Sequence, residues 1–186
     1  QAHFRRLYPK GLDSPDYGSI INGAQYERLT AWLAEAKQAG AEVHPCASPA
    51  RDDGARRLVP HLLTEVPGHC QLMQQEIFGP LLPLVPYDSI EEAIAYVAAR
   101  PRPLALYLMS LDPALQQRLS RETHAGGMAI NECLFQVAAD DAPFGGIGPS
   151  GMGHYHGHEG FLTFSKAKTV LRRGRFSTGS LIHPPY

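Results

Sequence analysis

The chain has 186 residues, 44% of them apolar, and its 17 basic and 18 acidic side chains leave a formal net charge of −1. This length and apolar content suffice for a domain with a sizeable core, and they exclude global disorder. The balanced charge gives no reason to expect nucleic acid or an anionic membrane as partner. No apolar run approaches the length of a membrane span.

The first residues indicate a piece of a longer protein. Residue 1 is glutamine rather than methionine, and the stretch 1–11 has the character of a helix end, with Phe4 and Leu7 three apart and Pro9 and Gly11 behind them. A helix end without its beginning predicts that sequence precedes this chain.

The next segment predicts a helix over 22–40, which Asn22 caps and Gly40 stops. A short strand is expected at 41–46, followed by a polar loop over 47–56. The stretch 57–66 is extended in character, with a bend or sheet edge at Pro60.

Three apolar strands then alternate with two amphipathic helices, which Ser89 and Asp112 are expected to cap. The strands are expected at 81–87, 103–110 and 126–131, and the helices at 89–100 and 112–123. At these lengths the helices serve as right-handed crossovers. The sequence therefore predicts an α/β fold with a parallel-rich sheet built from these three strands.

Regularity decreases after residue 131. A short helix leading into a strand is expected within 158–173, and the tail from residue 174 has no periodicity, which favours a surface position.

The stretch PFGGIGPSGMG, residues 143–153, has Gly146, Gly148 and Gly151 at the spacing G-x-G-x-x-G. A dinucleotide fingerprint needs a buried strand before the first glycine and a helix after the last. The preceding AADDA is polar, Pro149 interrupts the motif and no apolar stripe follows. The prediction is a tight loop with several glycines at positive φ.

Three histidines alternate in HYHGH, where His154, His156 and His158 would share one face of a strand and could bind a metal. Flanking glycines argue against a regular strand, and only Glu159 is adjacent as a further ligand. Structural or surface histidines are the favoured interpretation, and a metal site is the alternative.

QQEIFGPLLPL is more specific, because the backbone turns sharply at Gly79–Pro80 just before a buried strand. Glu76 stands at the strand entrance, where its carboxylate can accept two hydrogen bonds from a vicinal diol such as a ribose. From the chemistry alone, a solvated turn residue is the favoured alternative.

The cysteines Cys46, Cys70 and Cys133 are odd in number and form no C-x-x-C pair. None lies beside an evident activating cation or helix start, so each is interpreted as a passive thiol. A reducing, cytoplasmic setting is expected.

The motifs MQQEIFGPLLPL, RPLALYLMS, GGMAINECLF and DDAPFGGIGPSGMGHYHGHEGFLTFSKAK together resemble the aldehyde dehydrogenase superfamily, in its order and approximate spacing. The similarity is greatest to the class 3-like branch, especially the bacterial coniferyl aldehyde dehydrogenases. The ending LIHPPY also resembles the tail of that branch. It covers essentially the whole chain.

This resemblance implies an NAD- or NADP-dependent oxidation of an aldehyde, in which a cysteine thiolate adds to the carbonyl, hydride leaves for the nicotinamide and a glutamate assists hydrolysis of the thioester. In the family, that cysteine, that glutamate and the dinucleotide domain all precede the segment seen here. We expect residues 1–172 to form the C-terminal part of a catalytic domain and residues 173–186 to form a tail. We also expect the chain to contain no catalytic residue and to have no activity alone.

Four site residues follow from the resemblance. Glu76 is implied to bind the nicotinamide-ribose hydroxyls, Phe78 to lie beside that ribose, and Gln25 to approach the cofactor; Phe144 is implied to line the aldehyde channel. Gln136 stands where class 3 members often have histidine, which affects the shape of the substrate entrance.

The implied partners are a small aldehyde, the missing dinucleotide-binding domain and further copies of the full-length enzyme. The isolated chain is expected to bind no cofactor. Two alternatives stay open at this point: a non-catalytic binding or assembly module, and a metal-binding domain using His154, His156 and His158.

Overall fold

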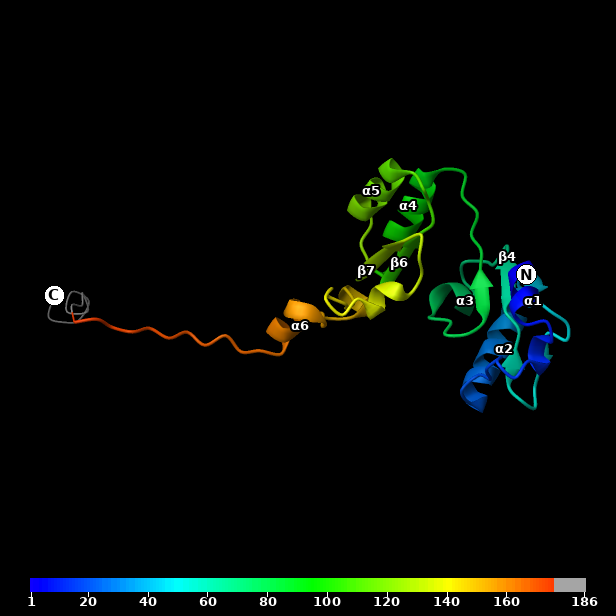
Figure 1. The fold of residues 1–186 in the computed structure, drawn as a ribbon. Coiled ribbons are helices and arrows are strands. Elements are labelled where there is room, and N and C mark those ends of the chain that lie inside the picture. Colours follow the sequence, from blue (N-terminus) through cyan, green and yellow to red (C-terminus); the bar gives the residue numbers. More distant parts are fainter. Residues whose placement is uncertain (176–186) are drawn as a thin grey trace. The chain divides into compact units, whose positions relative to one another are not determined.

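The computed structural model describes residues 1–175 and divides the chain into two compact units, Gln1–Tyr87 and Asp88–Tyr186. Figure 1 shows the elements of each unit. The expected surface position of the tail from 174 falls almost wholly outside the described residues, as does the LIHPPY ending.

The first unit combines helices with a small mixed sheet. Its elements are α1 (Ala2–Leu7), a 3-10 turn η1 (Gly11–Asp13), α2 (Gly23–Gln38), β1 (Glu42–Pro45), β2 (Arg51–Asp52), β3 (Arg57–Leu58), β4 (His61–Thr64), α3 (Gln71–Gln74) and β5 (Leu81–Pro83). The sheet order is β1-β4-β5, with β1 antiparallel and β5 parallel to β4. The parallel pair is joined through α3, as parallel neighbours need a crossover.

The long helix α2 forms as the sequence predicts. The Asn22 side-chain oxygen accepts a hydrogen bond from the Gln25 N–H at 2.9 Å, which satisfies one of the free donors of the first turn. At the other end Gly40 has φ 100°, a conformation that glycine adopts without a Cβ clash.

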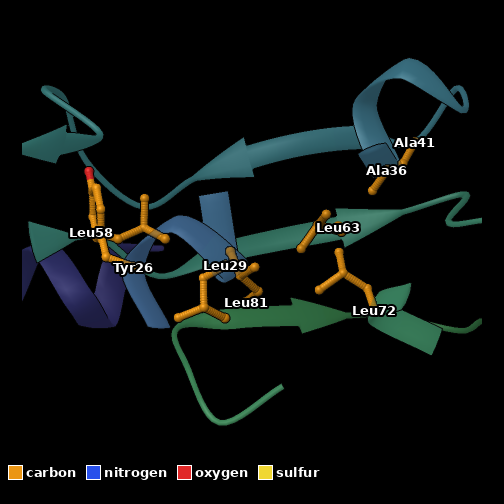
Figure 2. Packing of buried hydrophobic residues seen from close by; sticks show 8 residues of the cluster. All are labelled: Tyr26, Leu29, Ala36, Ala41, Leu58, Leu63, Leu72 and Leu81. Carbon is orange, nitrogen blue, oxygen red and sulfur yellow. The ribbon is translucent and has the colours of Figure 1, made fainter. Parts of the chain in front are cut away.

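One face of α2 builds the main core against the sheet, as Figure 2 shows. Leu29 of α2 and Leu63 of β4 are both completely buried, and Leu81 of β5 and Leu72 of α3 complete the cluster. Burying a leucine side chain contributes about 1.5–3 kcal/mol, so this contact fixes the helix on the sheet.

A second, smaller cluster holds the chain start on the same unit. Phe4 of α1 packs with Leu12, Cys46 and Val59, and the Arg5 Nε donates to the Cys46 carbonyl at 3.1 Å. The predicted helix end at residues 1–11 is therefore a short, anchored helix.

The second unit contains a parallel strand pair and three α-helices. Its elements are α4 (Ile90–Ala98), β6 (Ala105–Leu108), α5 (Pro113–Glu122), β7 (Gly127–Ile130), the 3-10 turns η2 (Phe135–Ala138) and η3 (Gly148–Ser150), and α6 (Gly157–Thr163). Strands β6 and β7 pair in parallel with α5 as their crossover, as expected. Ser89 caps α4 and Asp112 caps α5 through their side-chain oxygens.

Three expectations about detail are wrong, although the α/β class with parallel strands is confirmed. The predicted three-stranded sheet is divided: β5 pairs with β4, while β6 pairs with β7. The predicted polar loop contains β2, which pairs with β3 in a two-residue ladder. After α6, residues 164–175 form no strand, and the exposed Val170 and Leu171 of that stretch find no sheet neighbour there.

The same physical reason explains the first and third differences. An apolar run predicts a strand but not the strand it pairs with, because pairing is set by tertiary contacts. Across residues 1–175, no helix has both the length and the apolar character needed to cross a membrane.

Candidate functional site

The E-I-F-G-P turn, residues 76–80, is anchored from two sides in the first unit. On the sheet side, the His61 N–H of β4 donates to the Pro80 carbonyl at 2.9 Å. On the helix side, Gly79 lies directly against the buried Leu29 of α2, where an added Cβ would come within 2.5 Å of a Leu29 methyl. The turn is thus anchored to the core of the first unit rather than being a free loop.

Arg28 of α2 ties the turn down further. Its guanidinium donates to the carbonyl of Ile77 at 2.6 Å and to that of Glu76 at 3.3 Å. The remaining Nε donates to the Gln25 side-chain oxygen at 2.7 Å, and the guanidinium lies 4.2 Å above the Trp32 ring. One planar cation therefore fixes the turn and the Gln25 side chain together.

Phe78 is displayed by this anchored turn. Its side chain is 85% exposed and its backbone has φ 45°, a region that bulky residues rarely adopt. Such strained positions persist where the surroundings determine them, and they concentrate at binding sites. An exposed aromatic on a fixed backbone is suited to contact a ligand rather than to fill a core.

Gln25 and Phe78 both line one pocket of about 640 Å³. Its wall is mostly apolar, with Ile20, Ile21 and Pro80 among the contributors. Tyr17 also lines the pocket, and its hydroxyl donates to the Leu58 carbonyl at 2.6 Å. Burial raises the pKa of Tyr17 to about 12, so its side chain stays a neutral phenol.

Glu76 does not line that pocket, although it belongs to the same turn. Its side chain is exposed, and the carboxylate makes no hydrogen bond or ion pair with any of the residues 1–175. Only the Glu76 carbonyl is used, by Arg28. The carboxylate therefore keeps its full capacity to accept hydrogen bonds.

Phe144, the expected channel residue, lies in the second unit. It is half-buried and forms an isolated antiparallel bridge with Tyr155. Both residues line a pocket of about 400 Å³, together with Leu104, Met152 and Phe164. The residues proposed for the cofactor and for the aldehyde are thus carried by different units.

The glycine-rich stretch is an irregular loop, as predicted. Gly148, Gly151 and Gly153 all have positive φ. A Cβ at Gly146 would overlap the Ser150 carbonyl, so the backbone folds tightly onto itself. No strand immediately precedes this loop, and the next helix, α6, begins only at Gly157. A phosphate cradle needs both flanking elements, and neither is in place.

The three histidines do not form a metal site. No group of three histidine, cysteine or acidic side chains lies close enough to hold a metal within the described part of the chain. His154 contacts Glu159 at 3.5 Å, while His156 lies against aromatic rings and His158 is exposed. The described residues therefore give the metal alternative no ligand set.

Two of the three cysteines contribute to packing. Cys46 and Cys70 are buried and Cys133 is exposed, all as free thiols. Burial, with a smaller contribution from Glu35, raises the pKa of Cys70, which disfavours the thiolate that a nucleophile requires.

Sequence reasoning missed Arg28. A single arginine on an amphipathic helix has no pattern that distinguishes it from a solvated residue. Only the fold, which brings residues 76–77 to α2, gives it two of its three acceptors.

The aldehyde dehydrogenase family model matches residues 6–170. A probable coniferyl aldehyde dehydrogenase of Pseudomonas aeruginosa is 53% identical over 97% of this chain and 37% of its own length. The 4,4'-diaponeurosporen-aldehyde dehydrogenase of Staphylococcus aureus is 42% identical over 98% of this chain and 39% of its own length. The chain thus spans less than two fifths of either relative.

Solved structures agree. The substrate-bound Staphylococcus aureus AldH superposes with a TM-score of 0.82 at 41% identity, over 96% of this chain and 38% of that one. The Mycobacterium tuberculosis aldehyde dehydrogenase complexed with NAD+ gives a TM-score of 0.74 at 29% identity, over 86% of this chain and 33% of that one. With a family match over most of its length, the chain belongs to the aldehyde dehydrogenase family.

Proposed function

We propose that this chain is the cofactor-contacting and substrate-lining part of an NAD(P)-dependent aldehyde dehydrogenase that oxidises an aldehyde to the acid. Residues 1–172 belong to the catalytic domain and 173–186 to the tail. The names of the relatives support a large, conjugated aldehyde of the coniferyl type as substrate. A cytoplasmic, oligomeric enzyme remains our expectation.

The observation that carries this proposal is the anchored E-I-F-G-P turn. It presents an exposed Phe78 at positive φ and a Glu76 carboxylate without a partner among residues 1–175, next to a pocket lined by Gln25. A carboxylate and an aromatic face together suit a ribose with its attached ring. These residues fit a nicotinamide ribose, with Glu76 accepting from the hydroxyls.

The cofactor, when bound, supplies the acceptor for hydride. The residues of this chain bind and orient: Arg28 fixes the turn, Glu76 accepts the ribose hydroxyls, and Phe144 shapes the aldehyde channel. The nucleophile is not among Cys46, Cys70 and Cys133. We therefore expect the isolated 186-residue chain to oxidise no aldehyde.

The test is Glu76→Ala in the complete enzyme. A hydrogen bond to a charged acceptor is worth about 1.5–3 kcal/mol, so cofactor affinity should fall roughly ten- to a hundredfold with the fold intact. Titration of the cofactor by fluorescence measures the affinity, and circular dichroism verifies the fold. Glu27→Ala, which removes an exposed carboxylate from α2, is the matched control.

Unchanged affinity in the Glu76 variant would contradict the ribose contact. It would favour the other interpretation, a binding or assembly module in which Glu76 is a solvated turn residue.

A further inference from the structure

Two aromatic side chains, Tyr155 and His156, lie against the expected channel residue Phe144 in the second unit. Phe144 and Tyr155 exchange both backbone hydrogen bonds, at 2.8 and 2.9 Å, and their rings meet edge-to-face at 5.8 Å and 83°. The His156 ring meets Tyr155 edge-to-face at 4.4 Å and stacks on Phe144 at 6.2 Å with 28° between the planes. Phe144 is thus braced by an edge-to-face contact with Tyr155 and by a stacked contact with His156.

The backbone of His156 is fixed independently of its ring. Its φ is 73°, and its carbonyl accepts from the Gly160 N–H of α6 at 2.8 Å. The next residue, Gly157, lies so close to the Asp141 carbonyl that a Cβ there would come within 2.7 Å of it. The backbone of this histidine is thus fixed, and its ring lies against Phe144 and Tyr155.

The His156 ring acts through its faces rather than through hydrogen bonds at Nδ1. That atom is buried and has no hydrogen-bond partner among residues 1–175. A buried polar atom without a partner destabilises, so the aromatic contacts are the favourable interactions of this half-buried ring.

We propose that His156 is a positioning residue that holds the Phe144 ring in the orientation required by the aldehyde channel. The inference rests on the proposed function, because Phe144 must line the channel for its orientation to matter. A braced ring presents one fixed wall to a large planar aldehyde. A two-carbon aldehyde is too small to depend on that wall.

The test compares coniferyl aldehyde with acetaldehyde in the complete enzyme. His156→Ala is expected to raise KM for coniferyl aldehyde about three- to tenfold, the value of one aromatic pair, and to leave kcat/KM for acetaldehyde within about twofold. His156→Phe, which keeps a stacking ring without Nδ1, should restore the KM. His158→Ala, an exposed histidine two residues on, is the matched control and should change neither substrate.

A double-mutant cycle separates this inference from the proposed function. If His156 acts through Phe144, the Phe144→Ala/His156→Ala enzyme should have the KM of Phe144→Ala alone. A silent Phe144→Ala would contradict the channel role and this inference with it. If Phe144→Ala raises the KM for coniferyl aldehyde, but His156→Ala either leaves that KM unchanged or adds its own effect to that of Phe144→Ala, only the inference about His156 is overturned. Should His156→Ala fail to fold, His156→Leu, with bulk but no ring, takes its place.

Discussion

At the scale of single residues, Arg28 connects more of the candidate site than any motif residue does. Its guanidinium reaches two carbonyls of the E-I-F-G-P turn and the Gln25 side chain while stacking on Trp32. A lysine ammonium cannot reproduce this planar fork, because it is a compact point charge. Arg28 thus positions Glu76 and Phe78 without belonging to the recognisable motif.

We therefore expect Arg28→Lys in the complete enzyme to weaken cofactor affinity about tenfold, the lower value for one lost charged hydrogen bond. Cofactor titration measures it. Arg100→Met is the matched control, since Arg100 donates to the Tyr96 carbonyl and stacks on the Tyr96 ring in the other unit. An Arg28→Lys enzyme with unaltered affinity would show that the turn needs no arginine.

At the scale of elements, local signals predicted the helices well. The caps Asn22, Ser89 and Asp112 all accept the expected backbone hydrogen bonds, because capping depends only on neighbours in sequence. Pairing of strands was predicted less well. Strand β5 joins β4, and the two-residue β2 has no apolar alternation to reveal it.

The candidate site divides in the same way. The resemblance predicted Glu76 and Phe78 as site residues, and the structure brings Phe78 to one pocket with Gln25. The anchoring of that turn by Arg28 and Leu29 joins segments about fifty residues apart, and no local pattern encodes such a contact.

The packing of α2 on the turn gives a sharp prediction at this scale. In Gly79→Ala the new Cβ would lie 2.5 and 2.7 Å from the two Leu29 methyl carbons, and Leu29 is fully buried. Overpacking of this kind costs about 1–3 kcal/mol of unfolding free energy, measurable by urea denaturation. Adding Leu29→Val, which shortens the obstructing side chain, should recover part of the loss.

Gly68→Ala is the control for that experiment, because a Cβ at Gly68 meets no atom within 4 Å. Equal stability of the Gly79 and Gly68 variants would contradict the close packing of the turn on α2.

At the scale of the whole molecule, the two units differ in how they are stabilised. Nearly all the buried apolar side chains belong to residues 1–87, and Leu108 and Leu119 are the exceptions among the described residues. The first unit also buries His61 on its central strand β4, where Nδ1 donates to the Val59 carbonyl at 2.7 Å. Stability against acid should therefore be governed by this unit.

Burial lowers the pKa of His61, and the Val59 carbonyl opposes this only in part. Below about pH 6.5, the usual histidine pKa, the unfolded chain binds the proton more readily than the folded chain does. The unfolding free energy must then fall as the pH falls from 6.5 toward the folded pKa, by at most about 1.4 kcal/mol per pH unit. Above pH 6.5 the contribution of His61 does not change.

Denaturation followed by the fluorescence of Trp32, the single tryptophan, reports on this unit. Between pH 7 and pH 5 we expect the midpoint of the parent chain to decrease more than that of His61→Leu, which has no imidazole to protonate. His69→Gln, a change at an exposed histidine of the same unit, should follow the parent. If His61→Leu loses as much stability as the parent over this range, another group controls the acid response and the burial of His61 is not its cause.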